Sequence, residues 1–170
     1  MFKKIDFLVI DVDGTMTDSG IYYDNNGNEL KKFCTRDAVG FFTAKKAGIK
    51  TIIITGRESE ATKKRLSELK ADYVFQNINN KADFLKKFMN EKNIEPSHIG
   101  FIGDDLNDLE AMKFTGFIAC PSDSIKEIID ISDYVSPIKG GYGVVTDVVR
   151  HILNKLGIWD KTISNLYGGI

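Results

Sequence analysis

The chain has 170 residues and a formal net charge of −1, with 42% hydrophobic and 28% charged residues. This composition fits one globular domain with its own core, and the charge gives no general attraction to nucleic acid or anionic membranes. Cys34 and Cys120 lie beside apolar residues and are expected as reduced thiols, with a disulfide between them as the alternative. Apolar runs are too short for a membrane span or a signal peptide, so we expect a cytoplasmic protein with no membrane partner.

The predicted strands are short, almost continuous apolar runs, the pattern of parallel strands that are covered on both faces. They are residues 5–10, 50–54, 72–75, 98–102, 116–119 and 133–135. Amphipathic segments between them predict helices over 37–47, 59–70, 81–92, 105–114, 124–131 and 143–156, with Asp37 and Ser59 as capping residues. The β-α-β-α order predicts an α/β fold, a doubly wound parallel sheet with right-handed crossovers.

Residues 20–33 (GIYYDNNGNELKKF) interrupt this alternation and are typical of a β-hairpin. The DNNGN stretch supplies the turn, and apolar residues, among them Tyr22, Tyr23 and Leu30, flank it on both sides. We find no internal repeat and no linker. Residues 1–170 are therefore interpreted as a single domain with this hairpin inserted after the first strand.

Reactive residue types follow four of the predicted strands, where open α/β sheets bind their ligands. They are Asp11 and Asp13 after the first, Thr55, Gly56 and Arg57 after the second, Lys81 after the third, and Asp104, Asp105 and Asp108 after the fourth. Each motif alone is explained as a turn, a helix cap or a solvated side chain. Their joint occurrence at successive strand ends favours a functional site.

Crowded carboxylates raise each other's pKa unless a cation neutralises them. Oxygen ligands without His or Cys suit Mg²⁺, which leaves coordination positions for water and phosphate. Thr55, the amide groups near Gly56 and Lys81 are the natural binding groups for an anion. The set predicts Mg²⁺-dependent phosphoryl transfer, with one carboxylate as nucleophile and the acid two residues away as general acid and then base.

The motifs DVDGT, TGR, Lys81 and GDDLND resemble, in order and spacing, the four motifs of the haloacid dehalogenase superfamily, and the resemblance covers nearly the whole chain. It implies a Rossmann-like fold, bound Mg²⁺ and an aspartyl-phosphate intermediate. Asp11 would be the nucleophile and a metal ligand. Asp13 would be the acid and base, with its backbone carbonyl on the metal, and its presence implies hydrolysis or phosphoryl transfer rather than dehalogenation.

The same resemblance implies roles for the other strand-end residues. Thr55, with Gly56 beside it, and Lys81 would bind the phosphoryl oxygens, and Asp104 would complete the metal site. Asp105 and Asp108 are expected to orient Lys81 or metal-bound water.

The chain leaves no room for the cap domain that many members of this superfamily carry. The hairpin takes up the residues between Thr15 and Arg36, and one helix and one strand take up those between Arg57 and Lys81. An open site needs a cover against water. The expected cover is another subunit, assembled through hairpin 20–33 into a ring, and the alternative is a hairpin folded over its own core.

The capless pattern, with RDAVG and a late GGYG, resembles the 3-deoxy-D-manno-octulosonate (KDO) 8-phosphate phosphatases, homotetramers of lipopolysaccharide biosynthesis. The resemblance implies hydrolysis of KDO 8-phosphate to KDO and phosphate, with nine-carbon, sialic-acid-type 9-phosphates as the alternative substrates. Both carry a carboxylate, for which Arg36 and Arg57 are the expected ligands. Ala38 replaces the usual glycine, and DGTM replaces DGVL, so both substrates stay open.

Residues 157–170 follow the last predicted helix and contain Gly168 and Gly169, which predicts a flexible C-terminal tail. The tail is either a frayed end or, by the resemblance, a flap that reaches a neighbouring active site.

A phospho-accepting receiver domain of a signalling system is the alternative from another class, because it is also doubly wound and binds Mg²⁺. Receivers have an adjacent acid pair at the first strand and a phosphate-accepting acid after the third, where this chain has FQNINNK. A non-catalytic scaffold is disfavoured by the complete set of catalytic residues.

Overall fold

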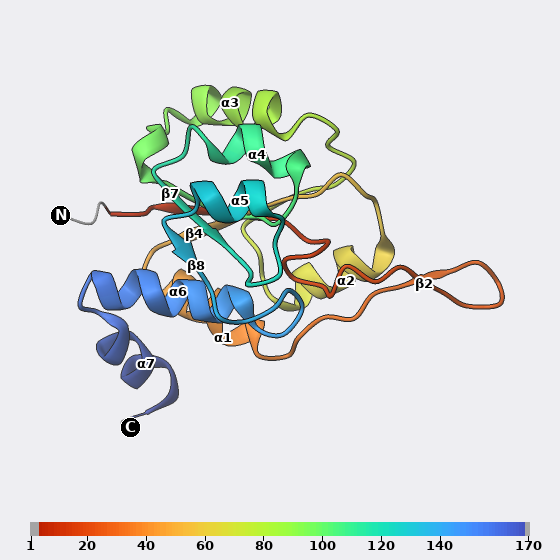
Figure 1. Cartoon of the computed structure of the whole chain (residues 1–170). Helices are drawn as coiled ribbons and strands as arrows, with labels where there is room; N and C mark the ends of the chain where they lie inside the picture. The colour runs from red at the N-terminus through yellow and green to blue at the C-terminus, as the bar shows by residue number, and fades with distance from the viewer. Residues whose placement is uncertain (1–3, 169–170) are drawn as a thin grey trace.

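This computed structural model describes residues 4–168 of the chain. A six-stranded parallel sheet forms its centre (Figure 1). The strands lie in the order β5-β4-β1-β6-β7-β8, so β1 lies between β4 and β6. They are β1 (Phe7–Ile10), β4 (Lys50–Ile54), β5 (Tyr73–Phe75), β6 (Ile99–Ile102), β7 (Phe117–Cys120) and β8 (Tyr134–Val135).

Helices follow the strands of this sheet in alternation, as the sequence predicts. They are α1 (Asp37–Lys46), α2 (Glu60–Glu68), α3 (Lys81–Lys92), α4 (Leu106–Met112), α5 (Lys126–Ile131), α6 (Val144–Lys155) and α7 (Trp159–Tyr167), with a 3₁₀ turn at Pro96–His98. Every predicted strand and every predicted helix is present, with bounds within about two residues of those expected. The doubly wound α/β fold is thereby confirmed.

The sheet has a hydrophobic core on each face, because successive side chains of a strand point to opposite sides. Leu8 and Ile10 of β1 pack in the core that contains α1, α2 and α6, whereas Val9 packs with α3, α4 and α5. Figure 1 shows these two helical layers above and below the sheet. Burial of each such side chain contributes roughly 1.5–3 kcal/mol, which explains why the strands are apolar throughout.

The first helix does not begin as predicted: the N-cap position is Arg36, and Asp37 is the first helical residue. The Asp37 side chain reaches across to α6, where its Oδ1 accepts a hydrogen bond from the Val145 N–H at 3.1 Å. The two helices are close enough for this because Gly40 of α1 faces Thr146, whose Cα would lie 2.8 Å from a Cβ at position 40. Asp37 therefore caps a neighbouring helix rather than its own.

The hairpin forms where the sequence predicts it, with β2 (Tyr22–Tyr23) paired antiparallel to β3 (Glu29–Leu30). Asp24 holds the turn, since its Oδ1 accepts the N–H groups of Asn26 and Asn28 at 2.8 Å each. Figure 1 shows the hairpin projecting from the domain. Phe33, at its base, packs against the core, but the tip does not fold over the core, so that alternative is wrong.

Residues Trp159–Tyr167 form helix α7, which corrects the prediction of a flexible tail over this segment. Thr162 and Ile163 are buried, and Trp159 packs against the core. The four-residue spacing of Trp159 and Ile163 is helical and is the signal that the glycines obscured. Gly169 lies outside the described residues. A flap over a neighbouring active site stays a prediction, which deletion of 162–170 tests: unchanged KM and kcat would contradict it.

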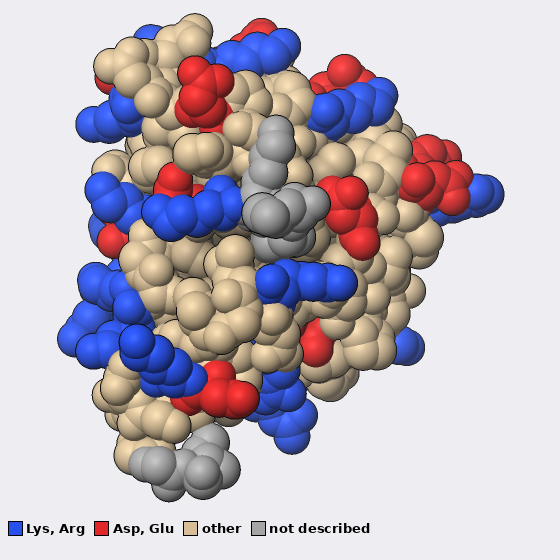
Figure 2. Space-filling model, turned by 90° about the vertical axis from the view of Figure 1, so that its left-hand side faces the viewer, with Lys and Arg blue, Asp and Glu red and all other residues tan. Residues whose placement is uncertain are grey.

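The face of the molecule opposite the hairpin carries side chains of both charges, as Figure 2 shows. Both cysteines are free, as expected. Among residues 4–168, no helix combines the length and the apolar character needed to cross a membrane.

Candidate active site

Most of the predicted site residues meet at the carboxyl edge of the sheet, because β1, β4 and β6 are neighbours there. Asp11 follows β1, Thr55 follows β4 and Asp104 lies just beyond β6. The Asp11 N–H donates to the Ile102 carbonyl at 2.9 Å, which continues the β1–β6 ladder up to the site. Parallel pairing thus brings together residues that are up to 93 positions apart in the sequence.

The turn after β1 is specified by Gly14, whose φ of +97° suits glycine and few other residues. A Cβ at this position would lie 1.9 Å from Asp104 Oδ2, so the turn can approach the second acidic loop only without a side chain. The Gly14 N–H donates to Thr17 Oγ1 at 3.2 Å, and Thr15 Oγ1 donates to Asp104 Oδ1 at 2.9 Å. The DGT sequence therefore fixes the first acidic loop against the second.

Lys81 is the first residue of α3 and is 2% exposed. Its Nζ lies 2.5 Å from Asp11 Oδ1 and 2.7 Å from Asp108 Oδ1. Burial opposes its charge, but the carboxylates of Asp11 and Asp108 together raise the pKa of Lys81 above its ordinary value. Lys81 is thus a fixed, charged ammonium group at the floor of the site, and its interpretation as a solvated helix lysine is wrong.

Asp11, Asp104 and Asp108 bring carboxylate oxygens within 4.8 Å of one another. Burial, followed by the carboxylate of Asp108, raises the pKa of Asp11 well above its usual range. Burial and Asp108 likewise raise the pKa of Asp104 to about 7. A divalent cation would relieve this repulsion, and an all-oxygen donor set suits Mg²⁺, so these residues fit the predicted metal.

Asp108 is fully buried and holds the second acidic loop in place. Its Oδ2 accepts the N–H of Asp104 at 3.1 Å, and its Oδ1 binds Lys81. Asp105 differs from the prediction: it is the N-cap of α4, its Oδ1 accepts the Leu106 N–H at 2.7 Å, and it is exposed. Asp108 therefore contacts Lys81, whereas Asp105 caps the helix that carries Asp108, and a role of either residue in orienting metal-bound water stays a prediction.

The side chain of Asp13 lies apart from the three-carboxylate cluster. Its Oδ1 pairs with the Nζ of Lys31, from the base of the hairpin, and its Oδ2 accepts the Thr55 hydroxyl at 3.4 Å. Gly56 adjoins Thr55, and the Arg57 N–H donates to Thr55 Oγ1 at 3.4 Å. Asp13 is 32% exposed in its side chain, so it can reach a bound molecule that the buried Asp11 faces from below.

The two predicted substrate arginines lie in different places. Arg57 is directed to the hairpin, where its Nη2 donates to Glu29 Oε2 at 2.9 Å. Arg36 lines a separate hollow of about 170 Å³ with Tyr142, Gly143 and residues of α6. Arg57 therefore lies one contact away from the Lys31–Asp13 pair, and no contact in the described chain joins Arg36 to the acids.

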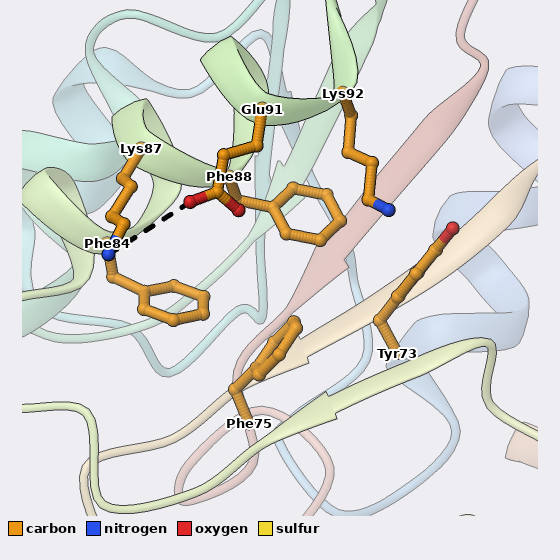
Figure 3. A pocket seen from close by; sticks show the side chains of 7 residues that line it. All are labelled: Tyr73, Phe75, Phe84, Lys87, Phe88, Glu91 and Lys92. Carbon is orange, nitrogen blue, oxygen red and sulfur yellow. Dashed lines mark ion pairs between the residues drawn. The ribbon is translucent and has the colours of Figure 1, made fainter.

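A larger hollow of about 340 Å³ lies between β5 and α3 and contains none of the predicted residues (Figure 3). The rings of Phe75, Phe84 and Phe88 line it, and Glu91 at its rim is 4.0 Å from Lys87. This hollow offers packed aromatic rings rather than a cluster of acids.

Three residues of the site were not predicted from the sequence: Thr15, Glu29 and Lys31. Thr15 stood in the quoted DGT motif without a role. Glu29 begins β3 and Lys31 directly follows it. The two residues are two positions apart, so alternation along an extended chain puts their side chains on the same side. The sequence does not say which face of a projecting hairpin turns toward the sheet edge.

Comparison with known proteins places the chain among hydrolases. A family model described as haloacid dehalogenase-like hydrolase matches residues 31–116. The 3-deoxy-D-manno-octulosonate 8-phosphate phosphatase KdsC of Escherichia coli K12 is 34% identical over 159 residues, which cover 94% of this chain and 85% of the relative.

Solved structures agree over nearly the whole chain. The 3-deoxy-D-manno-octulosonate 8-phosphate phosphatase of Moraxella catarrhalis, crystallised with magnesium ion, phosphate ion and KDO, matches with a TM-score of 0.91 and 34% identity, over 95% of this chain and 92% of that one. The cobalt-bound deoxy-D-mannose-octulosonate 8-phosphate phosphatase of Haemophilus influenzae matches with a TM-score of 0.87 and 28% identity, over 92% of each chain.

Proposed function

The chain belongs to the haloacid dehalogenase-like hydrolases, and from this membership we propose that it is a Mg²⁺-dependent phosphatase that hydrolyses KDO 8-phosphate to KDO and phosphate. One observation carries the chemistry: a buried carboxylate, Asp11, is fixed by Lys81 beside Asp104, and a second acid, Asp13, stands two residues away at the mouth. The choice of KDO 8-phosphate is supported by the relatives that match most of the chain.

The reaction proceeds in two displacements at phosphorus. Asp11 attacks, the bond from phosphorus to the sugar oxygen breaks, and Asp13 donates its proton to the departing oxygen. Asp13 then accepts a proton from water, which attacks the aspartyl-phosphate and releases phosphate with Asp11 restored. Lys81, through its positive charge, and Thr55, through its hydroxyl hydrogen bond, would stabilise the negative charge on the phosphoryl oxygens.

When bound, Mg²⁺ would neutralise negative charge on the phosphoryl group. Asp11 and Asp104 would hold it, with the backbone carbonyl of Asp13 as the third protein ligand. Asp108, which is committed to Lys81 and to the amide of Asp104, would support these ligands.

The substrate carboxylate is proposed to bind Arg57, which lies closer to the acids than Arg36 does. Its guanidinium donates to Glu29 at the hairpin base, beside the mouth of the site. A nine-carbon sugar-acid 9-phosphate is the second candidate substrate, and a comparison of kcat/KM for the two compounds decides between them.

A phosphate-release assay with and without Mg²⁺ tests the proposal. The chain should turn over KDO 8-phosphate many times with Mg²⁺ and lose activity on chelation, whereas a receiver domain would accept at most one phosphoryl group. Asp11→Asn should lower kcat by at least about 10⁴-fold. Asp83→Asn, at an exposed position of α3, is the matched control and should stay within about threefold. Near-normal activity of Asp11→Asn would exclude Asp11 as nucleophile.

We further propose that four copies assemble through the hairpin and cover each other's sites. Ile21, Tyr22, Tyr23 and Leu30 are 56%, 45%, 63% and 53% exposed and form an apolar surface on a projecting element. Light scattering on the purified chain tests the assembly. Tyr23→Lys with Leu30→Lys should give monomers with a raised KM, and Lys45→Glu on α1 serves as the control. A monomeric parent chain would overturn the proposal.

The cytoplasm is the proposed location. The free state of Cys34 and Cys120 supports a reducing compartment. Fractionation of the source cells tests this location.

A further inference from the structure

A chain of alternating charges joins the hairpin to the general acid. Arg57 donates to Glu29 Oε2 at 2.9 Å, Glu29 Oε1 lies 3.1 Å from Lys31 Nζ, and Lys31 Nζ pairs with Asp13 Oδ1. The exposed fraction of the Lys31 side chain is 3%, against 42% for Arg57. The side chains thus become progressively enclosed from Arg57 through Glu29, which is 18% exposed, to Lys31, and the enclosed Lys31 ammonium lies directly on the carboxylate of the more exposed Asp13.

Burial of Lys31 needs an explanation, because it removes an ammonium group from water and immobilises a long side chain. What Lys31 gains is two carboxylate partners, and one of them is the acid of the proposed reaction. Its placement therefore serves the orientation of Asp13.

We propose that Lys31 is a positioning residue that holds the Asp13 carboxyl group in the orientation needed to protonate the departing sugar oxygen. Thr55, 3.4 Å from Asp13 Oδ2, fixes the other oxygen only loosely, so the Lys31 contact determines the direction of the carboxyl group. Glu29 and Arg57 hold the ammonium in place. This inference rests on the proposed phosphatase activity and adds that the hairpin acts on catalysis within its own subunit.

Lys31→Met removes the ammonium group and keeps the length of the side chain. It is assayed on p-nitrophenyl phosphate, on glucose 6-phosphate and on KDO 8-phosphate. The two sugar phosphates have poor leaving groups that need a proton, and only KDO 8-phosphate has a carboxylate. We expect kcat/KM to fall about 10- to 100-fold on both sugar phosphates and less than about threefold on p-nitrophenyl phosphate, whose leaving group departs without a donor.

Three comparisons accompany this variant. Lys31→Arg should restore most of the lost kcat/KM, because it keeps a cation beside Asp13. Lys32→Met is the matched control on the same hairpin; its ammonium faces Asp18 at 3.4 Å and the Tyr142 ring at 3.7 Å, so it should not change the ratio between substrates. Glu29→Gln should lower the same two values by a smaller factor. The Mg²⁺ dissociation constant of Lys31→Met, measured by calorimetry, should stay within about threefold.

Each other result overturns the inference. A loss confined to KDO 8-phosphate makes Lys31 a ligand of the substrate carboxylate, and an equal loss on all three substrates makes it structural. If kcat/KM on glucose 6-phosphate is unchanged in both Lys31→Met and Glu29→Gln, Lys31 has no role in positioning Asp13. Failure of the parent chain to release phosphate from any of the three compounds is a different outcome, which refutes the proposed function itself.

Discussion

The two lysines of the site pair with the two proposed catalytic aspartates, and they come from contrasting parts of the molecule. Lys81 opens a helix packed on the sheet, is 1% exposed in its side chain, and binds Asp11 and Asp108 in the interior. Lys31 stands at the base of a projecting hairpin that has two residues in each strand, and it binds Asp13 at the mouth. The proposed nucleophile, Asp11, is thus held by the core, whereas the proposed acid, Asp13, is held by a slender insertion.

This contrast follows from what each acid does. A nucleophile attacks from one fixed direction, so burial and the contact with Lys81, which Asp108 also holds in place, would serve Asp11 in this role. An acid that also acts as a base must meet first a sugar oxygen and then water, which requires access to the mouth. The base of the hairpin supplies one wall there, and the exposed apolar residues Tyr22, Tyr23 and Leu30 of its strands form the surface through which the proposed assembly would cover the site.

The largest effect is expected when Asp11 and Asp108 lose the ammonium group of Lys81. Lys81→Met leaves Asp11 and Asp108 buried without their ammonium partner, which costs about 3–5 kcal/mol of unfolding free energy. The aspartyl-phosphate should no longer form, and kcat should fall at least about 10³-fold. Urea unfolding and phosphate release measure both. Lys87→Met, on the exposed face of α3, should change the unfolding free energy by no more than about 0.5 kcal/mol. A loss there as large as that of Lys81→Met would contradict a special role of the buried Lys81.

Asp13→Asn tests the part of the site that the base of the hairpin contacts. We expect kcat on KDO 8-phosphate to fall about 10²–10⁴-fold, because both proton transfers lose their carboxylate. With p-nitrophenyl phosphate, phosphorylated Asp11 should accumulate, since its hydrolysis needs the base, and intact-protein mass spectrometry detects the added phosphoryl group. Absence of that adduct, together with normal hydrolysis, would assign the acid to another residue.

Asp37 belongs neither to the Lys81–Asp11 pair nor to the Lys31–Asp13 pair. It provides a comparison through the pH dependence of the free energy of unfolding. Burial raises its pKa to about 6, although the amides of Thr146 and Val145 lower it in part. The native state therefore binds the proton more tightly than the unfolded chain does, and stability falls as pH rises from about 4 to about 6. The full loss, above pH 6, is roughly 3 kcal/mol.

Asp37→Asn removes this titration and keeps an oxygen for the Val145 amide. The difference in unfolding free energy between variant and parent should therefore grow in favour of the variant between about pH 4 and 6 and stay level above it. Urea titrations at several pH values measure it. A difference that does not change with pH would show that Asp37 is charged in both states across the range.

Arg57→Ala gives the smallest effect and sharpens the assignment of the hairpin edge. KM for KDO 8-phosphate should rise about 10-fold, because one charge-assisted contact to the carboxylate is lost. KM for p-nitrophenyl phosphate, which has no carboxylate, should stay within about threefold of the value of the parent chain. Arg36→Ala is the comparison variant, and a larger effect there would transfer the carboxylate site to the hollow beside α6.

Periodicity and turn residues were sufficient to predict the doubly wound sheet, because parallel strands covered on both faces leave continuous apolar runs at nearly fixed intervals. Asp11, Thr55, Lys81 and Asp104 could be named for the same reason: whatever follows a strand of such a sheet lies at its carboxyl edge. Among the α-helices of residues 4–168, only α7 was missed, because the prediction of a tail rested on Gly168 and Gly169 and did not use the helical spacing of Trp159 and Ile163.

The direction of each side chain within that edge was decided by tertiary structure alone. Nothing local to Asp13 turns it toward Lys31, and nothing local to Asp37 directs it to α6 rather than its own helix. Asp105 and Asp108 are neighbours in one motif, yet one is an exposed cap and the other a buried support for Lys81. Order along the chain determines which strand end a residue occupies, whereas contacts among distant segments determine what its side chain faces.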